Sequence, residues 1–182
     1  MKPAMILPGW SFDEMREDVE SVLAEWCEDV VPRHVELLPN NRYSPVYAWM
    51  FSYEKRLKYR IEDVIGRPLD RTEAAIFGAD GAFSEALSNA FVHGHQRDPD
   101  LPIEVRCCVG TRGLAFAIRD RGEGFDVERV VRAAARGGGY FSFAGNGLRA
   151  LSHHPEVAAC YENGGRMLLL RVGLTGQIVR GR

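Results

Sequence analysis

The stretch TEAAIFGADGAFSEALSNAFVHG, residues 72–94, decides how the rest of this chain can be arranged. Its apolar residues recur at steps of three and four, the spacing of an amphipathic helix. At about 100° per residue, these side chains share one side of a helix. They are Ile76, Phe83, Leu87, Ala90 and Phe91. The spacing therefore predicts one helix over residues 72–94 whose apolar side faces a core.

The opposite side of this predicted helix is small and nearly uncharged. Its residues are Gly78, Gly81, Glu85, Ser88, Asn89 and Val92, with His93 near the edge. A solvated face usually carries several Lys, Arg and Glu side chains, whereas here Glu85 and Asn89 lie one turn apart and point the same way. Two interpretations stay open: the helix crosses another backbone, or it lets a ligand approach closely.

The composition is that of one soluble domain with a small appendage: 182 residues, 46% hydrophobic, 26% charged, net charge −2. No apolar run is long enough to span a membrane and no signal-peptide pattern is present, which predicts a cytoplasmic protein. The four cysteines show no C-x-x-C spacing, so we expect reduced, structural thiols. They are Cys27, Cys107, Cys108 and Cys160, of which the adjacent pair should point to opposite faces of a strand.

The N-terminal segment predicts a helix from Ser11 to Val31, opened by a capping box of Ser11 and Glu14. It carries eight acidic residues against Arg16, a sum of −7. We assign residues 1–33 to an acidic N-terminal helical extension. Its charged face is either simply solvated or an arm for a basic partner or a second copy of the chain, which would make a homodimer.

The next segment predicts a short strand and a long helix. His34–Leu38 alternates as a strand does, and Pro45 stands at the first position of a helix that continues to Val64. Gly66 ends this helix.

After residue 102 the apolar period changes from that of a helix to that of a strand. Two hairpins are predicted. Their strands are Ile103–Val109 with Leu114–Ile118, and Val157–Tyr161 with Met167–Val172. The polar tail, residues 173–182, is expected to be loose.

Three groups of glycines lie between the two hairpins. Asp120-Arg-Gly-Glu-Gly124 follows a strand, Gly137–Gly139 ends a helix predicted over Val127–Arg136 with Asp126 as its cap, and Gly145-Asn-Gly147-Leu148 opens another helix. Such glycines suggest a phosphate-bearing ligand. A Walker loop is excluded because the last lysine of the chain is Lys58, and no dinucleotide fingerprint stands in a βαβ unit.

Three motifs in this order resemble those of the GHKL, or Bergerat-fold, ATPases. Glu85-Ala-Leu-Ser-Asn89-Ala-Phe-Val-His93-Gly94 resembles their N box, and the two glycine motifs at Asp120–Gly124 and Gly145–Leu148 resemble their two glycine boxes. The resemblance covers residues 34–172. It implies an α/β (α+β) two-layer sandwich, with a mixed or antiparallel sheet covered by helices on one face. Within the superfamily, the chain is similar to the anti-sigma-factor serine/threonine kinases.

The resemblance also implies roles for individual residues. The Asp120 carboxylate would accept a hydrogen bond from the adenine amino group, and Gly122 and Gly124 would let the backbone approach the base and sugar. The helix opened by Gly145, Gly147 and Leu148 would bind phosphate oxygens. Asn89 would be the protein ligand of Mg²⁺, and Glu85 would take the proton of an attacking hydroxyl. His93 would lie near the ATP.

The expected function is that of an ATP-dependent kinase that holds a sigma factor and phosphorylates a Ser or Thr of an antagonist protein. Two alternatives remain. One is a histidine-kinase-like catalytic domain acting on a separate phosphoacceptor protein. The other is an ATP-gated binding module without transfer. We expect no direct contact with nucleic acid or membrane.

Overall fold

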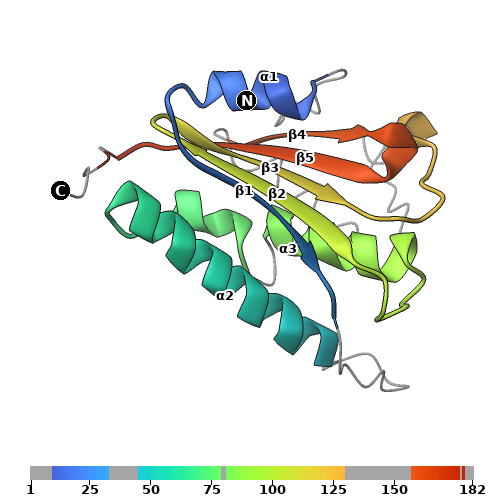
Figure 1. Cartoon of the computed structure of the whole chain (residues 1–182). Coiled ribbons are helices and arrows are strands. Elements are labelled where there is room, and N and C mark those ends of the chain that lie inside the picture. Colours follow the sequence, from blue (N-terminus) through green and yellow to red (C-terminus); the bar gives the residue numbers. More distant parts are fainter. Residues whose placement is uncertain (1–9, 33–44, 79–80, 130–156, 177, 179–182) are drawn as a thin grey trace.

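The computed structural model describes residues 10–32, 45–78, 81–129, 157–176 and 178 (Figure 1). The predicted strand at His34–Leu38, the three glycines Gly137–Gly139 and the motif at Gly145, Gly147 and Leu148 lie outside these residues. None of the helices among the described residues is long and apolar enough to cross a membrane.

A five-stranded antiparallel sheet forms the centre of the molecule. In chain order its strands are β1 (Val22–Val30), β2 (Ile103–Gly110), β3 (Gly113–Arg119), β4 (Val157–Glu162) and β5 (Met167–Gly173). They lie in the order β1-β2-β3-β5-β4. Both predicted hairpins are confirmed: β2 pairs with β3, and β4 pairs with β5. Every pairing between the described strands is antiparallel, so the described sheet is antiparallel rather than mixed.

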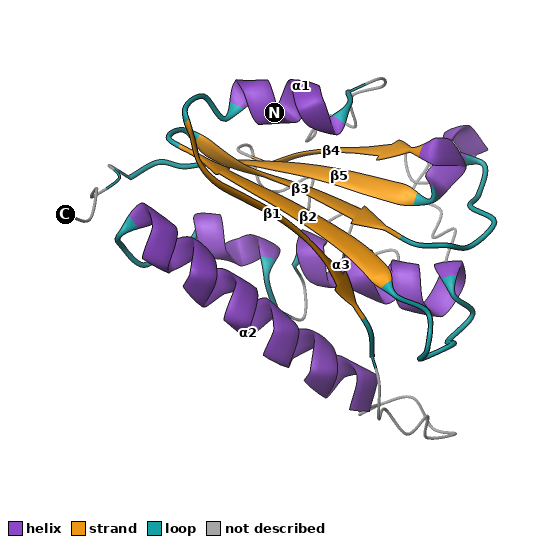
Figure 2. Cartoon of the chain, viewed as in Figure 1, coloured by secondary structure: helices purple, strands orange, loops and turns teal. Residues whose placement is uncertain are grey.

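Two helices, α2 (Pro45–Ile65) and α3 (Ala82–Asn89), cover one face of this sheet (Figure 2). The predicted start and end of α2, at Pro45 and just before Gly66, are confirmed. The apolar side of the central stretch is buried as predicted, and Phe83 packs against Phe116 of β3 with ring centroids 5.3 Å apart. The contact between Phe83 and Phe116 holds α3 against β3.

The prediction of a single helix over residues 72–94 is wrong. The stretch forms a short 3₁₀ helix at Glu73–Ile76, then α3, and then a π-helical turn at Ala90–Gly94. The break comes at Gly81, which has extended backbone angles as the residue before α3. A Cβ at Gly81 would lie 2.1 Å from the Ile76 carbonyl oxygen, so the chain can fold back here only with glycine.

The prediction of one helix from Ser11 to Val31 is also wrong after the first two turns. The capping box is present, but α1 spans only Phe12–Asp18. Glu20 has a left-handed φ of 63°, and β1 then begins as the edge strand beside β2. From Ala24 to Val30 the residues alternate between more buried and exposed, which is the period of a strand.

Helix α1 lies on the face of the sheet opposite α2 and α3 (Figure 1). It packs Phe12, Met15 and Val19 against a second, smaller core that includes Cys108. Helices therefore cover both faces, not one. The predicted boundary at residue 33 stays a prediction, but the segment before it is an integral strand of the sheet rather than a purely helical extension.

The cysteines follow the prediction. All four are free thiols. Cys107 belongs to the core under α2 and α3, whereas Cys108 belongs to the core under α1, so the adjacent pair does point to opposite faces.

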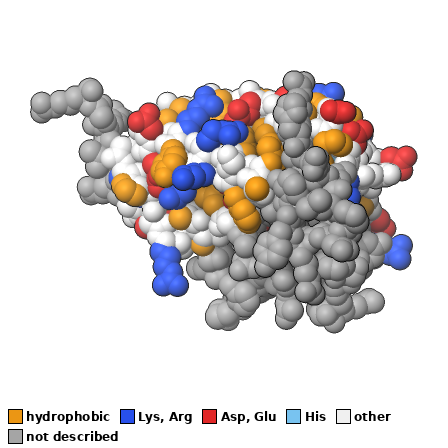
Figure 3. All heavy atoms as spheres, turned by 90° about the horizontal axis from the view of Figure 1, so that it is seen from below, with side chains coloured by type: hydrophobic (Ala, Val, Ile, Leu, Met, Phe, Trp, Pro, Cys, Tyr) orange, Lys and Arg blue, Asp and Glu red, His pale blue; other side chains and the backbone are white. Residues whose placement is uncertain are grey.

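The outer face of α2 mixes basic and apolar side chains (Figure 3). Phe51 and Tyr59 are exposed there, and Lys55 lies over the Tyr59 ring. Arg60 covers the Trp26 ring of β1, with its guanidinium carbon 4.0 Å from the ring centroid. Scattered apolar residues of this kind are ordinary for a protein surface, so this face alone indicates no partner.

The beginning of the predicted loose tail is fixed to the body of the protein. The backbone N–H of Thr175 donates to the Glu73 carboxylate at 2.8 Å. Glu73 is completely buried and also accepts two hydrogen bonds from the Arg67 guanidinium. This carboxylate thus joins the end of α2, the start of the central stretch and the segment after β5.

Candidate functional site

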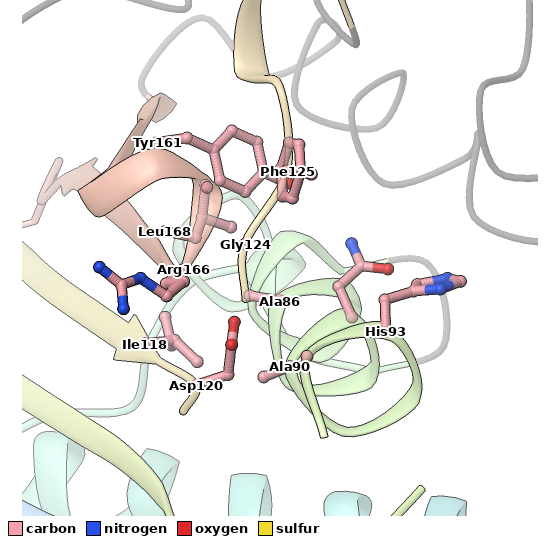
Figure 4. A pocket seen from close by; sticks show the side chains of 13 residues that line it. Ala86, Ala90, His93, Ile118, Asp120, Gly124, Phe125, Tyr161, Arg166 and Leu168 are labelled. Atoms are coloured by element: carbon pink, nitrogen blue, oxygen red, sulfur yellow. The ribbon is translucent and has the colours of Figure 1, made fainter. Parts of the chain in front are cut away.

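A cavity of about 170 Å³ lies between the α3 segment and the ends of β3, β4 and β5 (Figure 4). Its helical wall is formed by Ala86, Asn89, Ala90, His93 and Gly94. The sheet and its loops contribute the other wall, formed by Ile118, Asp120, Gly124, Phe125, Tyr161, Gly165, Arg166 and Leu168. Four predicted site residues therefore meet at one cavity: Asn89, His93, Asp120 and Gly124.

Asp120 lies at the end of β3, and its carboxyl group is directed into the cavity (Figure 4). Its backbone N–H donates to the Arg166 carbonyl at 2.9 Å, and its Oδ1 accepts from the Gly122 N–H at 2.8 Å. Burial raises the pKa of this carboxyl above its ordinary value. A fixed carboxyl group in an otherwise apolar cavity can select a ligand that offers a hydrogen-bond donor.

Gly122 has a different role from the one predicted for it. It does not line the cavity; a Cβ there would lie 2.1 Å from the Gly94 carbonyl oxygen. A Cβ at Gly94 would in turn lie 2.6 Å from Asp120 Oδ1. These two glycines let the turn after β3 pack directly on the end of the central stretch, so their small size serves the protein backbone.

Glu85 and Asn89 share a face of α3, as predicted, and the Asn89 amide is close enough to affect the pKa of the Glu85 carboxyl. Asn89 lines the cavity, whereas Glu85, one turn earlier on α3, is not among the residues that line it. Burial raises the pKa of Glu85 to about 7 even though the Asn89 amide opposes the shift. The buried Oε1 of Glu85 has no hydrogen-bond partner among the described residues. A carboxylate with a free oxygen and a pKa near neutrality suits a group that exchanges protons.

Tyr161 of β4 also contributes to this group, although the sequence did not point to it. It lines the cavity together with Asn89, and burial raises the pKa of Tyr161 to about 12. Its ring meets the Phe125 ring edge to face, with centroids 5.0 Å apart (Figure 4). Asn89 and Tyr161 therefore contribute polar groups to the same cavity.

His93 lies at the cavity wall but is itself exposed. Partial burial, and after it the charge of Arg97, lowers the pKa of His93 below its ordinary value. It is placed to contact a ligand at the cavity mouth.

The described fold is an antiparallel α+β sandwich in which a strand-end carboxylate and an asparagine of α3 line the same cavity. Residues 65–172, more than half of the chain, match the family model of the histidine kinase-like ATPase domain. The chain therefore belongs to the histidine kinase-like ATPase family, which confirms the resemblance to the GHKL superfamily. No curated protein matches the chain.

The residues at the cavity fit ATP with Mg²⁺, the ligand this family implies. The Asp120 carboxyl would offer an acceptor to the adenine amino group in a mainly apolar cavity. The described residues contain no group of three or more His, Cys, Asp and Glu side chains that could hold a metal. A Mg²⁺ ion held by Asn89 would therefore need phosphate oxygens and water as its other ligands, which is its usual preference.

Asn89→Ala is expected to weaken Mg·ATP binding by about 10–100-fold, because the triphosphate loses the protein ligand of its metal. Nucleotide binding in the presence of a chelator should change much less. Calorimetric titrations with and without Mg²⁺ measure both. Ser88→Ala, at a half-buried neighbour that does not line the cavity, is the control. An unchanged Mg²⁺ dependence in Asn89→Ala would exclude this residue as the metal ligand.

Glu85 should make the stability of the nucleotide-free protein depend on pH. Its pKa is about 7 in the folded state and 4.5 in the reference state, so the folded protein binds the extra proton between these values. Stability is then lost as pH rises through this window, by at most about 3 kcal/mol. Urea unfolding at pH 5 and pH 8, in chelator, should show this loss relative to Glu85→Gln. Parallel pH profiles for the two proteins would contradict the raised pKa.

Proposed function

We propose that this chain is an ATP-dependent serine/threonine protein kinase of the anti-sigma-factor type. It would hold a sigma factor in the cytoplasm and phosphorylate a Ser or Thr of an antagonist protein. The observation that carries the proposal is the cavity itself: Asp120 lies on one wall, and Asn89, one turn after Glu85 on α3, lies on the other. The family match supports ATP as the ligand.

Each residue of the site would have its own role in phosphoryl transfer. Asp120 would select the adenine, and Asn89 would hold the metal that neutralises the phosphates. Bound Mg·ATP supplies the phosphoryl group. Glu85 accepts the proton of the attacking hydroxyl while that oxygen bonds to the terminal phosphorus and the bond to the leaving ADP breaks. Tyr161, whose ring packs edge to face on Phe125, would lie beside Asn89 at the same cavity and limit its movement.

Binding of nucleotide is tested first. ATP and ADP should bind more tightly than GTP, by about 1–3 kcal/mol for one well-placed buried hydrogen bond. Equal affinities for ATP and GTP in calorimetry would contradict the adenine contact of Asp120.

Phosphoryl transfer is tested with partner proteins captured in the presence and absence of ATP. Acid-stable phosphate on a Ser or Thr of a captured antagonist would support the proposal. Acid-labile phosphate on a histidine would instead select the histidine-kinase-like alternative. ATP-dependent capture without any transfer would select the binding module.

A further inference from the structure

His95 is a buried histidine that the proposed chemistry does not use. It follows the π-helical turn that ends the central stretch, and only 3% of it is exposed. Its Nε2 atom accepts a hydrogen bond from the backbone N–H of Arg121 at 3.0 Å. Since a backbone N–H can only donate, Nε2 must be unprotonated. The imidazole is therefore neutral with its proton on Nδ1, and burial, which lowers the pKa of His95, favours this state.

The Arg121 N–H is one of three consecutive anchors in the turn that carries Asp120. The Asp120 N–H bonds to the Arg166 carbonyl, the Arg121 N–H bonds to His95, and the Gly122 N–H bonds to the Asp120 carboxyl. Among the hydrogen bonds of the described residues, the one to His95 ties this turn to the segment that follows α3. The other ties of the turn are to β5, to itself and, through the exposed Arg121 side chain, to Asp29 of β1.

The contact between His95 and the turn continues through its neighbour Gly94. A Cβ at Gly94 would lie 2.6 Å from Asp120 Oδ1, and a Cβ at Gly122 would lie 2.1 Å from the Gly94 carbonyl oxygen. The segment Gly94–His95 and the turn Asp120–Gly122 therefore fit together without free space. A small shift of one against the other would move the Asp120 carboxyl inside the cavity.

We propose that His95 is a positioning residue that fixes the Asp120 carboxyl and so sets the preference for a purine with a 6-amino group over one with a 6-oxo group. This inference rests on the proposed adenine contact of Asp120. A single hydrogen bond discriminates between ligands only when its acceptor is held in place before the ligand arrives, because a mobile carboxyl can turn to another donor. His95 supplies that constraint through the backbone of Arg121.

The test compares ATP and GTP affinities of the full chain and three variants by calorimetry. His95→Leu removes the acceptor and should lower ATP affinity about tenfold with little effect on GTP, so that the preference for ATP falls by the same factor. His95→Gln retains an acceptor near Nε2 and should restore most of the preference. Gln96→Asn, at the exposed neighbour, should behave as the parent. Thermal unfolding of each protein shows that it is folded.

The outcomes separate this inference from the function on which it rests. If the parent prefers ATP and His95→Leu keeps that preference while folded, the positioning role is overturned and the adenine contact stands. If the parent does not discriminate between ATP and GTP, the adenine contact and the positioning role fall together. Should His95→Leu not fold, His95→Asn takes its place, because its amide is too short to reach the Arg121 N–H. Nitrogen NMR of the parent must also show Nε2 unprotonated; a protonated Nε2 overturns the inference.

Discussion

Glu85→Gln is expected to lower phosphoryl transfer by about 10²–10⁴-fold, the usual contribution of a positioned general base. The substitution keeps the shape of the side chain and removes the group that accepts the proton from the attacking hydroxyl. Nucleotide affinity should hold or improve slightly, because a negative charge near the phosphates is lost. Single-turnover transfer to the captured antagonist at pH 8, above the pKa of about 7, measures the effect with the parent base ionised.

The control for this prediction is Glu17→Gln, the same chemical change at an exposed position of α1 far along the chain from the site. It should leave both transfer and affinity unchanged. If Glu85→Gln transfers phosphate at the parental rate, then Glu85 is a buried polar partner of Asn89 and not a base. If the parent transfers no phosphate to any captured protein, the binding-module function replaces the kinase.

The strands of the two hairpins could be predicted from the sequence because their signal is local. In β2 and β3, apolar side chains alternate over a few residues on each side of a Gly-containing turn, and no distant contact is needed to recognise them. The apolar side of the central stretch was predictable for the same reason, since Phe83 and Leu87 bury the face that their spacing indicates.

The elements that could not be predicted depend on contacts between distant segments. Strand β1 has acidic residues and a helix-compatible spacing, and its identity comes from pairing with β2, some eighty residues later in the chain. In the central stretch, Gly81 was counted as part of a small helical face. The structure shows instead that the chain turns there against the Ile76 carbonyl. Periodicity cannot distinguish these cases, because it does not include tertiary contacts.

At the candidate site, too, the residues in local motifs could be predicted, whereas those that depend on distant contacts could not. The motifs identified Asn89, Asp120 and Gly124, which do meet at the cavity. Tyr161 and His95 could not be predicted because neither belongs to a recognisable spacing, and each meets its neighbours at the site only through the tertiary fold. Phe125 could have been found, since it follows Gly124 directly and the loop after β3 was already part of the predicted site.

Glu73→Gln is expected to destabilise the protein by about 3–5 kcal/mol at pH 7, because it breaks a buried ion pair and leaves its partners unsatisfied. The fully buried carboxylate accepts from Arg67 at 2.7 and 2.8 Å and from the backbone N–H groups of Asp70 and Thr175 at 2.9 and 2.8 Å. Burial alone would raise the pKa of Glu73, but these donors lower it to about 2. Urea unfolding of the parent and the variant measures the difference.

The pH dependence distinguishes this carboxylate from an ordinary buried side chain. Its folded pKa of about 2 lies below the reference value of 4.5, so its contribution is complete above pH 4.5 and is lost as pH falls towards 2. The difference in free energy of unfolding between the parent and Glu73→Gln should therefore decrease by about 3 kcal/mol as the pH falls across this window. Asp63→Asn, at an exposed carboxylate of α2, should show neither effect.

Arg67→Met separates the contribution of the ion pair from that of the backbone N–H groups. If Arg67→Met lowers the free energy of unfolding as much as Glu73→Gln does, the ion pair carries the stability. If it is much milder, the two backbone N–H groups that tie the segment after β5 to the start of the central stretch carry it instead. A difference in free energy of unfolding that stays constant down to pH 3 would contradict the lowered pKa of Glu73. The destabilisation would then come from side-chain packing alone.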